Sequence, residues 1–190
     1  MQRIIIGLTG ASGAIYGIRL LEVLRSVADV ETHLIVSSAA KQTITLESIY
    51  SLTDIQEMAD VVYEDRDIDA AISSGSFITS GMIVMPCSIK TLSGIANSYN
   101  DTLITRAADV VLKEKRKLIL GVRETPLHLG HLRLIMNVIE IGAIIFPPIP
   151  AFYYQPETVQ DIVDQTINRI LDQYGISLPK TLFTRWQGAK

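Results

Sequence analysis

The chain has 190 residues, of which 48% are hydrophobic and 19% charged, and its formal net charge is −3. One domain spanning residues 1–190 is predicted, because about 100 to 200 residues per domain is usual. The charged fraction lies below the average of about 25%, which predicts that extra apolar surface is buried between subunits. The longest basic cluster, 113–117, is too small for the broad positive surface of a nucleic-acid-binding protein.

The apolar runs and the cysteine content exclude further classes. The runs at 4–8 and 141–146 are far shorter than the roughly 20 residues that cross a bilayer, and the first is too short for a signal peptide. With Cys87 as the one cysteine, neither an intrachain disulfide nor a cysteine-based zinc site can form. We therefore expect a cytoplasmic protein that binds neither membranes nor nucleic acid.

Taken in chain order, short apolar runs alternate with segments of helical pattern. The runs are apolar on both faces, as buried parallel strands are, and the segments between them are long enough for crossover helices. Strands are predicted at 3–8, 31–36, 81–85, 118–122 and 143–146. Helices are predicted at 14–27, 39–50, 90–97, 102–115, 127–141 and 157–174. The fold class is therefore α/β, with a doubly wound parallel sheet in a single domain.

Three segments depart from this alternation. Residues 63–80 are acidic and then serine-rich, which predicts a surface excursion, and 146–156 contains four prolines and cannot be helical. The tail, 177–190, carries Trp186 near its end. A free tail would leave this large apolar ring exposed, so we expect the tail to pack, in an oligomer on neighbouring subunits.

The turn after the first predicted strand, 9–14, combines glycines with the hydroxyls of Thr9 and Ser12 and leads directly into a helix. Small residues let an anion approach the backbone, and a helix N-terminus offers free N–H groups, so a phosphate cradle is predicted. A tight turn without a ligand is the alternative. The dinucleotide and P-loop fingerprints are missing, and Ser37 and Ser38 follow the second strand where an acidic residue would bind a ribose. A mononucleotide is favoured.

Two further strand ends carry polar residues. Ser88 is a predicted N-cap followed by more hydroxyls, which fits either a binding site or an ordinary capped helix. Cys87 is read as a small buried apolar residue, because no base is apparent beside it. Arg123 and Glu124 follow the fourth strand, where an arginine can grip phosphate and a carboxylate can move protons; a structural ion pair is the alternative.

The C-terminal third offers more candidates. Tyr153, among prolines, forms a rigid wall of either a pocket or a subunit contact. Arg169 borders the apolar stripe of the last helix and requires an anion, either a protein carboxylate or a ligand phosphate. Arg106 and Lys113 share a helix face that by itself reads as solvated. The histidines at 128 and 131 lack a third ligand, and the acidic run 64–69 reads as a solvated loop, so no metal site is predicted.

Several longer motifs resemble one family. They are TGASGAIYG at 9–17, PCSIKTLSGIA at 86–96, RAADVVLKEKRKLILGVRETPLHLGH at 106–131, PPIPAFYYQP at 147–156 and RWQG at 185–188. Together they cover nearly the whole chain and resemble the UbiX flavin prenyltransferases, whose enterobacterial members were formerly called phenolic or aromatic acid decarboxylases.

This resemblance implies a Rossmann-like subunit that assembles into a homododecamer and binds FMN at subunit interfaces. The positions that match flavin-binding residues of the family are Gly10, Ala11, Ser12, Ser37, Ser88, Ile89, Lys90, Thr91 and Arg123. The positions that match binding residues for the prenyl phosphate are Tyr153, Arg169, Arg106 and Lys113. Arg106 and Lys113 by themselves indicated only a solvated helix face, but the resemblance favours a role for both at the prenyl phosphate.

The implied reaction transfers the dimethylallyl group of dimethylallyl monophosphate to N5 of reduced FMN and then closes a ring at C6, without a metal. Ser12 and Glu124 match the pair that moves the proton lost on ring closure, and Glu47 matches another active-site position. Lys113 matches a position whose donor helps the phosphate to leave, and Trp186 would face developing allylic cation character. The prenylated FMN would serve a separate UbiD-type decarboxylase.

Two other functions are weighed against this one. One is an FMN-dependent cysteine decarboxylase, whose relatives carry an asparagine in the motif after the third strand, where this chain has Lys90. The other is a non-catalytic flavin carrier, or a flavin-carrying subunit of an aromatic acid decarboxylase, which would bind FMN without consuming the phosphate ester.

Overall fold

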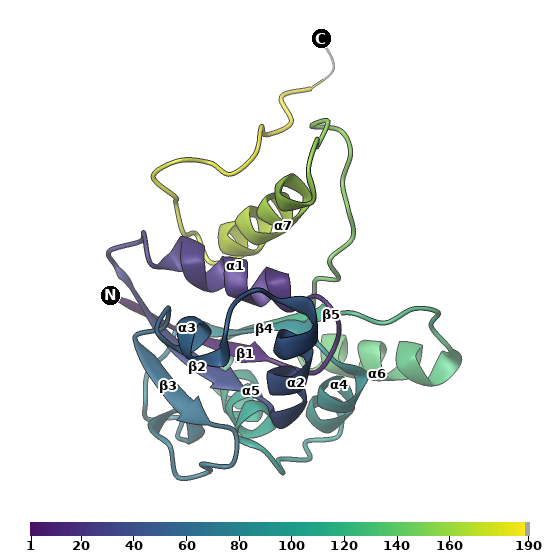
Figure 1. The fold of residues 1–190 in the computed structure, drawn as a ribbon. Coiled ribbons are helices and arrows are strands. Elements are labelled where there is room, and N and C mark those ends of the chain that lie inside the picture. Colours follow the sequence, from purple (N-terminus) through teal and green to yellow (C-terminus); the bar gives the residue numbers. More distant parts are fainter. Residues whose placement is uncertain (189–190) are drawn as a thin grey trace.

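A six-stranded sheet forms the centre of the computed structural model, which describes residues 1–188 (Figure 1). All strand pairs are parallel, and the strand order is β3-β2-β1-β4-β5-β6. The strands are β1 (Gln2–Leu8), β2 (Val30–Val36), β3 (Val61–Glu64), β4 (Gly81–Cys87), β5 (Lys117–Val122) and β6 (Ile144–Ile145). The order reverses direction between β1 and β4, as in a doubly wound Rossmann-like sheet.

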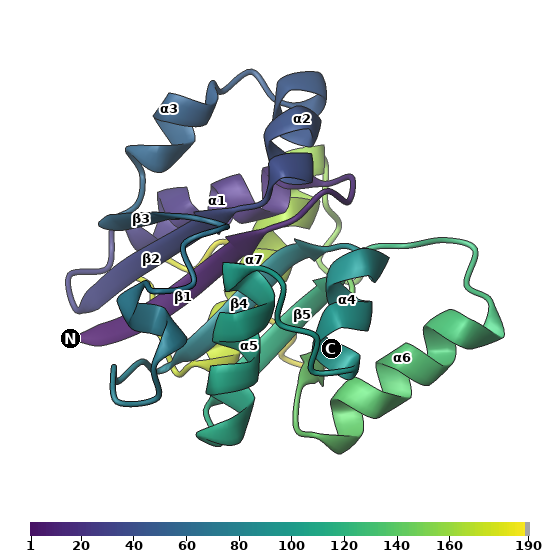
Figure 2. The ribbon, with the colours of Figure 1, turned by 90° about the horizontal axis from the view of Figure 1, so that it is seen from below.

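Helices cover both faces of this sheet (Figure 2). One face packs against α1 (Ala14–Leu24), α2 (Ser38–Glu47), α3 (Leu52–Gln56) and α7 (Val159–Gln173). The other face packs against α4 (Ile89–Ala96), α5 (Leu103–Lys113) and α6 (Leu129–Glu140), with a short 3-10 helix at Ala71–Ser73. Figure 2 shows α6 projecting beyond the body of the domain.

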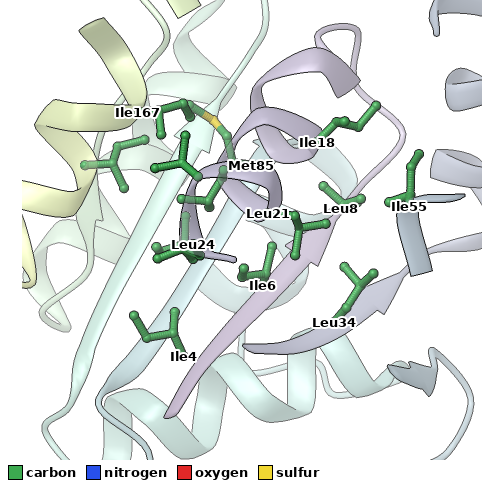
Figure 3. Packing of buried hydrophobic residues seen from close by; sticks show 14 of the residues in the cluster. Ile4, Ile6, Leu8, Ile18, Leu21, Leu24, Leu34, Ile55, Met85 and Ile167 are labelled. Carbon is green, nitrogen blue, oxygen red and sulfur yellow. The ribbon is translucent and has the colours of Figure 1, made fainter. Parts of the chain in front are cut away.

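Side chains of the central strands alternate between two hydrophobic clusters. In β1, Ile4, Ile6 and Leu8 point toward α1 and α7, whereas Ile5 points toward α4 and α5. Figure 3 shows Ile6 and Leu8 packed beside Leu21 of α1. Because both faces are covered, the strands are apolar at nearly every position. The strand runs are therefore apolar on both faces in the sequence because helices cover both faces of the sheet.

The structure confirms the predicted fold class, the five predicted strands and the six predicted helices, with ends that move by a few residues. It adds β3 and α3, which the sequence did not predict. β3 is an edge strand of four residues whose burial alternates, and it overlaps the start of the segment 63–80, so that expectation of a surface excursion was partly wrong. α3 has five residues, too few for a helical period, and is marked only by the capping box of Ser51 and Asp54.

Gly17 is a point where α1 touches the sheet. A Cβ atom at Gly17 would collide with the Leu8 side chain and with the carbonyl oxygen of Met85. Because that oxygen belongs to the backbone of β4, the helix itself would have to move. We expect Gly17→Ala to lower the free energy of unfolding by about 3 kcal/mol, measured by urea denaturation.

Gly175→Ala is the matched control for this substitution. Gly175 has a φ of +67°, and an added Cβ meets no atom within 4 Å. Gly175→Ala should lower the free energy of unfolding by about 1 to 2 kcal/mol, because alanine disfavours the left-handed backbone at this position. An equal loss in the two variants would contradict the close contact between α1 and the sheet.

Candidate active site

The carboxyl ends of β1 and β4 meet at the point where the strand order reverses. The chain leaves β1 toward α1 on one face and leaves β4 toward α4 on the other, and open α/β sheets bind their ligands in a crevice at such a point. The Thr9 hydroxyl ties these turns together: it donates to the carbonyl oxygen of Pro86 at 2.7 Å and accepts from the Ser88 amide at 2.8 Å. Thr9 is buried. The expectation that the Thr9 hydroxyl faces a phosphate was wrong, because the hydroxyl is occupied by these two hydrogen bonds to the β4 end.

The N-terminus of α1 already has an anion from within the chain. The Gly13 amide donates to the Glu47 carboxylate at the end of α2, at 2.8 Å. Burial, the largest single cause, acts to raise the pKa of Glu47, and hydrogen bonds from Gly13 and Ser12 act against it. With smaller contributions from the Ala14 amide and the charge of Arg123, the pKa of Glu47 lies below its ordinary value. The turn thus differs from the predicted phosphate cradle: a carboxylate occupies its helix end.

The lowered pKa of Glu47 predicts a pH-dependent contribution to stability. The contribution is complete above the ordinary glutamate pKa of about 4.3 and is lost as pH falls through the lower folded-state value. Because Glu47 is exposed, Glu47→Gln should cost only about 0.5 to 1 kcal/mol at neutral pH, a typical value for an anion at a helix N-terminus. Urea unfolding over a pH series measures this. A difference that persists in acid would contradict the charge-based origin.

A second pocket lies where α2, α4 and α5 begin. Its volume is about 390 Å³, and its lining includes Ser37, Lys90, Thr91 and Thr102. Ser37 and Ser88 are the N-caps of α2 and α4, whose first turns offer amides to this region, whereas the first turn of α5 already binds the Asp65 carboxylate. Together with the Lys90 ammonium, these groups fit a phosphate monoester.

The far wall of this pocket carries residues that sequence reasoning missed. Asp65, Arg66 and Asp101 line it. Asp65 accepts from the Ile104 amide at 3.2 Å, and burial raises its pKa above the ordinary value. The only sequence signal was the acidic run 64–69, which we read as a solvated loop. The acidic run lines this pocket because β3 places it opposite the first turn of α4.

Arg123 and Glu124 follow β5 at the same edge of the sheet. Both are exposed, and the Arg123 amide donates to the carbonyl oxygen of Cys87 at 3.1 Å. Glu124 accepts from the Thr125 amide at 3.0 Å. Within residues 1–188 no ion pair joins Arg123 to Glu124, so the structural alternative does not occur there. Both side chains are available at the mouth of the crevice.

A larger pocket of about 630 Å³ lies between α7, the proline-rich segment and the tail. Its lining consists of Tyr153, Gln165, Arg169, Phe183, Arg185 and Trp186. The rings of Tyr153 and Trp186 meet edge to face with centroids 5.9 Å apart, and Gln165 donates to the Tyr153 hydroxyl at 3.4 Å. The pocket thus combines a basic side chain, a phenol and an aromatic wall.

Two expectations from the sequence are clarified here. Arg169 bonds a protein carboxylate, Asp172, at 3.1 Å, yet its side chain remains 45% exposed and able to meet a ligand. The tail lies along α7 within this chain, where Phe183 is buried, but the Trp186 ring, which was expected to be covered, remains 63% exposed. Packing on neighbouring subunits stays a prediction.

The structure does not bring Arg106 and Lys113 to this pocket. Both lie on α5, which covers the opposite face of the sheet from α7. Arg106 pairs with Asp109 at 3.2 Å, and Lys113 pairs with Glu114 at 2.8 Å. Any role of these two cations at a prenyl phosphate therefore requires a second copy of the chain.

The remaining candidates are structural in the described chain. Burial raises the pKa of Cys87 to about 12, so its thiol is inert, as expected. His128 caps α6 by accepting from the Gly130 amide at 3.0 Å, and its ring lies on that of His131. Among residues 1–188, no three potential metal-ligating side chains (His, Cys, Asp or Glu) gather, and no helix has the length and apolarity needed to cross a bilayer.

Comparison with known proteins places the chain in a family. A model of the flavoprotein family matches residues 1–171. The flavin prenyltransferase UbiX of Escherichia coli (strain K12) is 64% identical over 189 residues, with 100% of this chain and 100% of its own covered. The corresponding enzyme of Thauera aromatica is 54% identical over 98% of this chain and 95% of its own.

Solved structures agree with these relatives. A dodecameric FMN-dependent UbiX-like decarboxylase from Escherichia coli O157:H7 has a TM-score of 0.94 and 51% identity over 99% of this chain and 100% of its own. AnUbiX (PadA1) in complex with FMN and dimethylallyl pyrophosphate has a TM-score of 0.96 and 46% identity over 100% of this chain and 99% of its own. The peptidyl-cysteine decarboxylase EpiD, 19% identical with a TM-score of 0.62 over 80% of this chain and 84% of its own, shares the fold alone.

Identity along the full length, the family model and the matching solved structures agree: the chain belongs to the flavoprotein family and, within it, to the UbiX-type flavin prenyltransferases.

Proposed function

We propose that this protein transfers the dimethylallyl group of dimethylallyl monophosphate to reduced FMN. The observation that carries the proposal is the presence of two separate pockets suited to anions, one around Lys90 and one around Arg169, in a chain of this family. Two phosphate esters must be held at once for this reaction, one on the acceptor and one on the donor. The complex of AnUbiX (PadA1) with FMN and dimethylallyl pyrophosphate, a related phosphate ester, supports the proposal.

The pocket around Lys90 is proposed to hold the FMN phosphate. Ser37, Ser88 and Thr91 supply hydroxyls, and the first turn of α4, with Ile89 and Lys90, supplies amides and a positive charge. The turn with Gly10, Ala11 and Ser12 and the side chain of Arg123 lie at the neighbouring strand ends, where they are proposed to hold the ring. Reduced FMN, when bound, supplies the nucleophilic N5 and C6 atoms.

The pocket around Arg169 is proposed to hold the prenyl phosphate. Arg169 and the Tyr153 hydroxyl would bind the phosphate and stabilise it as it departs, which is where negative charge develops. The π face of Trp186 would stabilise positive charge on the allylic group. Ser12 and Glu124 would take up the proton released on ring closure. Glu47, ionised beside Ser12, would orient that hydroxyl.

Oligomerisation is part of the proposal, because Arg106 and Lys113 can reach a prenyl phosphate only on a neighbouring copy. An apolar stripe on α6 supports self-association: its residues at intervals of three and four, Leu129, Leu132, Met136 and Ile139, are all exposed. The UbiX-like relative from Escherichia coli O157:H7 is dodecameric. We propose the same assembly for this chain, working in the cytoplasm and supplying a UbiD-type decarboxylase.

The test is anaerobic incubation of the protein with reduced FMN and dimethylallyl monophosphate, followed by mass spectrometry of the flavin. A flavin heavier by one prenyl unit, with release of phosphate, is the expected result. Unchanged flavin on folded, FMN-loaded protein would reject the proposal and favour the flavin carrier. Carbon dioxide released from a cysteine-containing peptide would instead favour the cysteine decarboxylase.

A further inference from the structure

Asp172, near the end of α7, is the centre of a network beside the pocket around Arg169. Arg185 binds it through both guanidinium ends, with Nη1 donating to Oδ2 at 2.8 Å and Nη2 donating to Oδ1 at 2.7 Å. Arg169 donates to Oδ2 through one nitrogen at 3.1 Å. The hydrogen bond from Arg185 is the first cause that holds the pKa of Asp172 below its ordinary value. Arg185 therefore has the stronger of the two arginine contacts.

Other contacts fix the same segment of the tail. The Leu182 amide donates to the Asn168 side chain at 3.0 Å, and the Phe183 ring meets the edge of Tyr154 with centroids 5.6 Å apart. The Arg185 guanidinium also lies 5.7 Å from the centre of the Phe183 ring. Figure 1 shows the tail, in yellow, rising beside α7 toward the C-terminus. Trp186 follows directly and meets Tyr153, so the pocket wall depends on where Arg185 is held.

We propose that Arg185 is a positioning residue for prenyl transfer: its two-pronged bond to Asp172 fixes the tail over α7 so that Trp186 and Phe183 complete the prenyl pocket. This inference rests on the proposed function. It assigns no contact between Arg185 and the reacting atoms.

The bond to Asp172 also affects Arg169. A lone carboxylate beside a phosphate site would repel the phosphate and would hold Arg169 for itself. With Arg185 satisfying both oxygens of Asp172, Arg169 keeps only a single bond there. A phosphate can then take over Arg169, because charge-assisted bonds from a guanidinium to phosphate are strong and can be bidentate.

The test compares Arg185→Gln with the wild type in two measurements on the FMN-loaded protein. The first is hydrogen exchange of the peptide covering 181–187, which we expect to become faster in Arg185→Gln because the tail is released. The second is steady-state prenyl transfer. We expect the KM for dimethylallyl monophosphate to rise by about fivefold, the upper effect of one exposed ion pair, with FMN affinity unchanged.

Three further variants sharpen the test. Lys180→Gln removes a positive charge from the same tail at an exposed position, and it should change neither measurement. Arg185→Lys keeps the charge but loses the fork, so its KM should lie between those of wild type and Arg185→Gln. Asp172→Asn should release the tail as Arg185→Gln does, because it removes the same bond from the other side.

The outcomes separate this inference from the proposed function. If the wild type prenylates FMN and Arg185→Gln changes its KM by less than about twofold, the positioning role is overturned while the function stands. If hydrogen exchange of 181–187 is the same in both proteins, the claim that the bond from Arg185 to Asp172 fixes the tail is overturned, whatever the activity. If the wild type does not prenylate FMN, the proposed function fails, and the exchange measurement alone decides whether Arg185 holds the tail.

Discussion

Arg169→Gln is expected to lower kcat/KM for prenyl transfer by about a hundredfold or more, because it removes a charged donor from the departing phosphate. Gln keeps a neutral donor but is shorter and lacks the guanidinium fork, so the loss combines charge and geometry. FMN affinity should stay unchanged, since Arg169 lines a different pocket from Lys90. Steady-state kinetics and flavin titration measure the two quantities separately.

The control for this prediction is Arg25→Gln. Arg25 is an exposed arginine at the C-terminal end of α1, so the substitution removes the same charge from the protein without touching the pocket. It should leave kcat/KM unchanged. A comparable loss in Arg25→Gln would attribute the effect to net charge, and a full rate in Arg169→Gln would remove Arg169 from the phosphate site.

Glu124→Gln is expected to lower kcat by about a hundredfold to ten-thousandfold, the range that a positioned general base contributes. The KM values for both ligands should stay nearly constant, because the amide occupies the same volume and Glu124 lies at the mouth of the crevice without an ion-pair partner in the described chain. A lower kcat at constant KM shows that the substitution removed an interaction that is made only in the transition state.

Glu57→Gln provides the comparison for Glu124. Glu57 is exposed at the end of α3 and forms no part of either pocket. The kcat of Glu57→Gln should therefore equal that of the wild type. If Glu124→Gln raises the KM for FMN and leaves kcat intact, Glu124 acts in binding. The proton transfer would then belong to another group near Ser12.

The fold was largely predictable because its main elements each carry a local signal. Buried parallel strands must be apolar on both faces, and the β1, β4 and β5 runs are apolar at nearly every position. α5 and α7 begin with threonine caps that the sequence displays. Short or edge elements such as β3 and α3 have no comparable signal, because four or five residues do not establish a period.

The site was predictable in part. Residues that directly follow strands, such as Ser37, Ser88 and Arg123, lie at one edge of the sheet because parallel strands share a direction. The family resemblance added Glu47 and gave roles to Tyr153 and Trp186, which the residues alone had marked only as part of a wall and as a ring that should pack.

The sequence by itself determined which residues end the strands and which turns are rich in glycine and hydroxyl side chains, since these follow from local chain geometry and composition. Only the tertiary structure decided that Glu47 occupies the start of α1, that Thr9 serves the sheet, and that Asp172 binds both Arg169 and Arg185. Each of the contacts made by Glu47, Thr9 and Arg185 joins residues at least 13 positions apart in the chain. Hydrogen bonds and ion pairs act over a few ångströms of space, so a pattern along the chain cannot specify them until packing has set the distances.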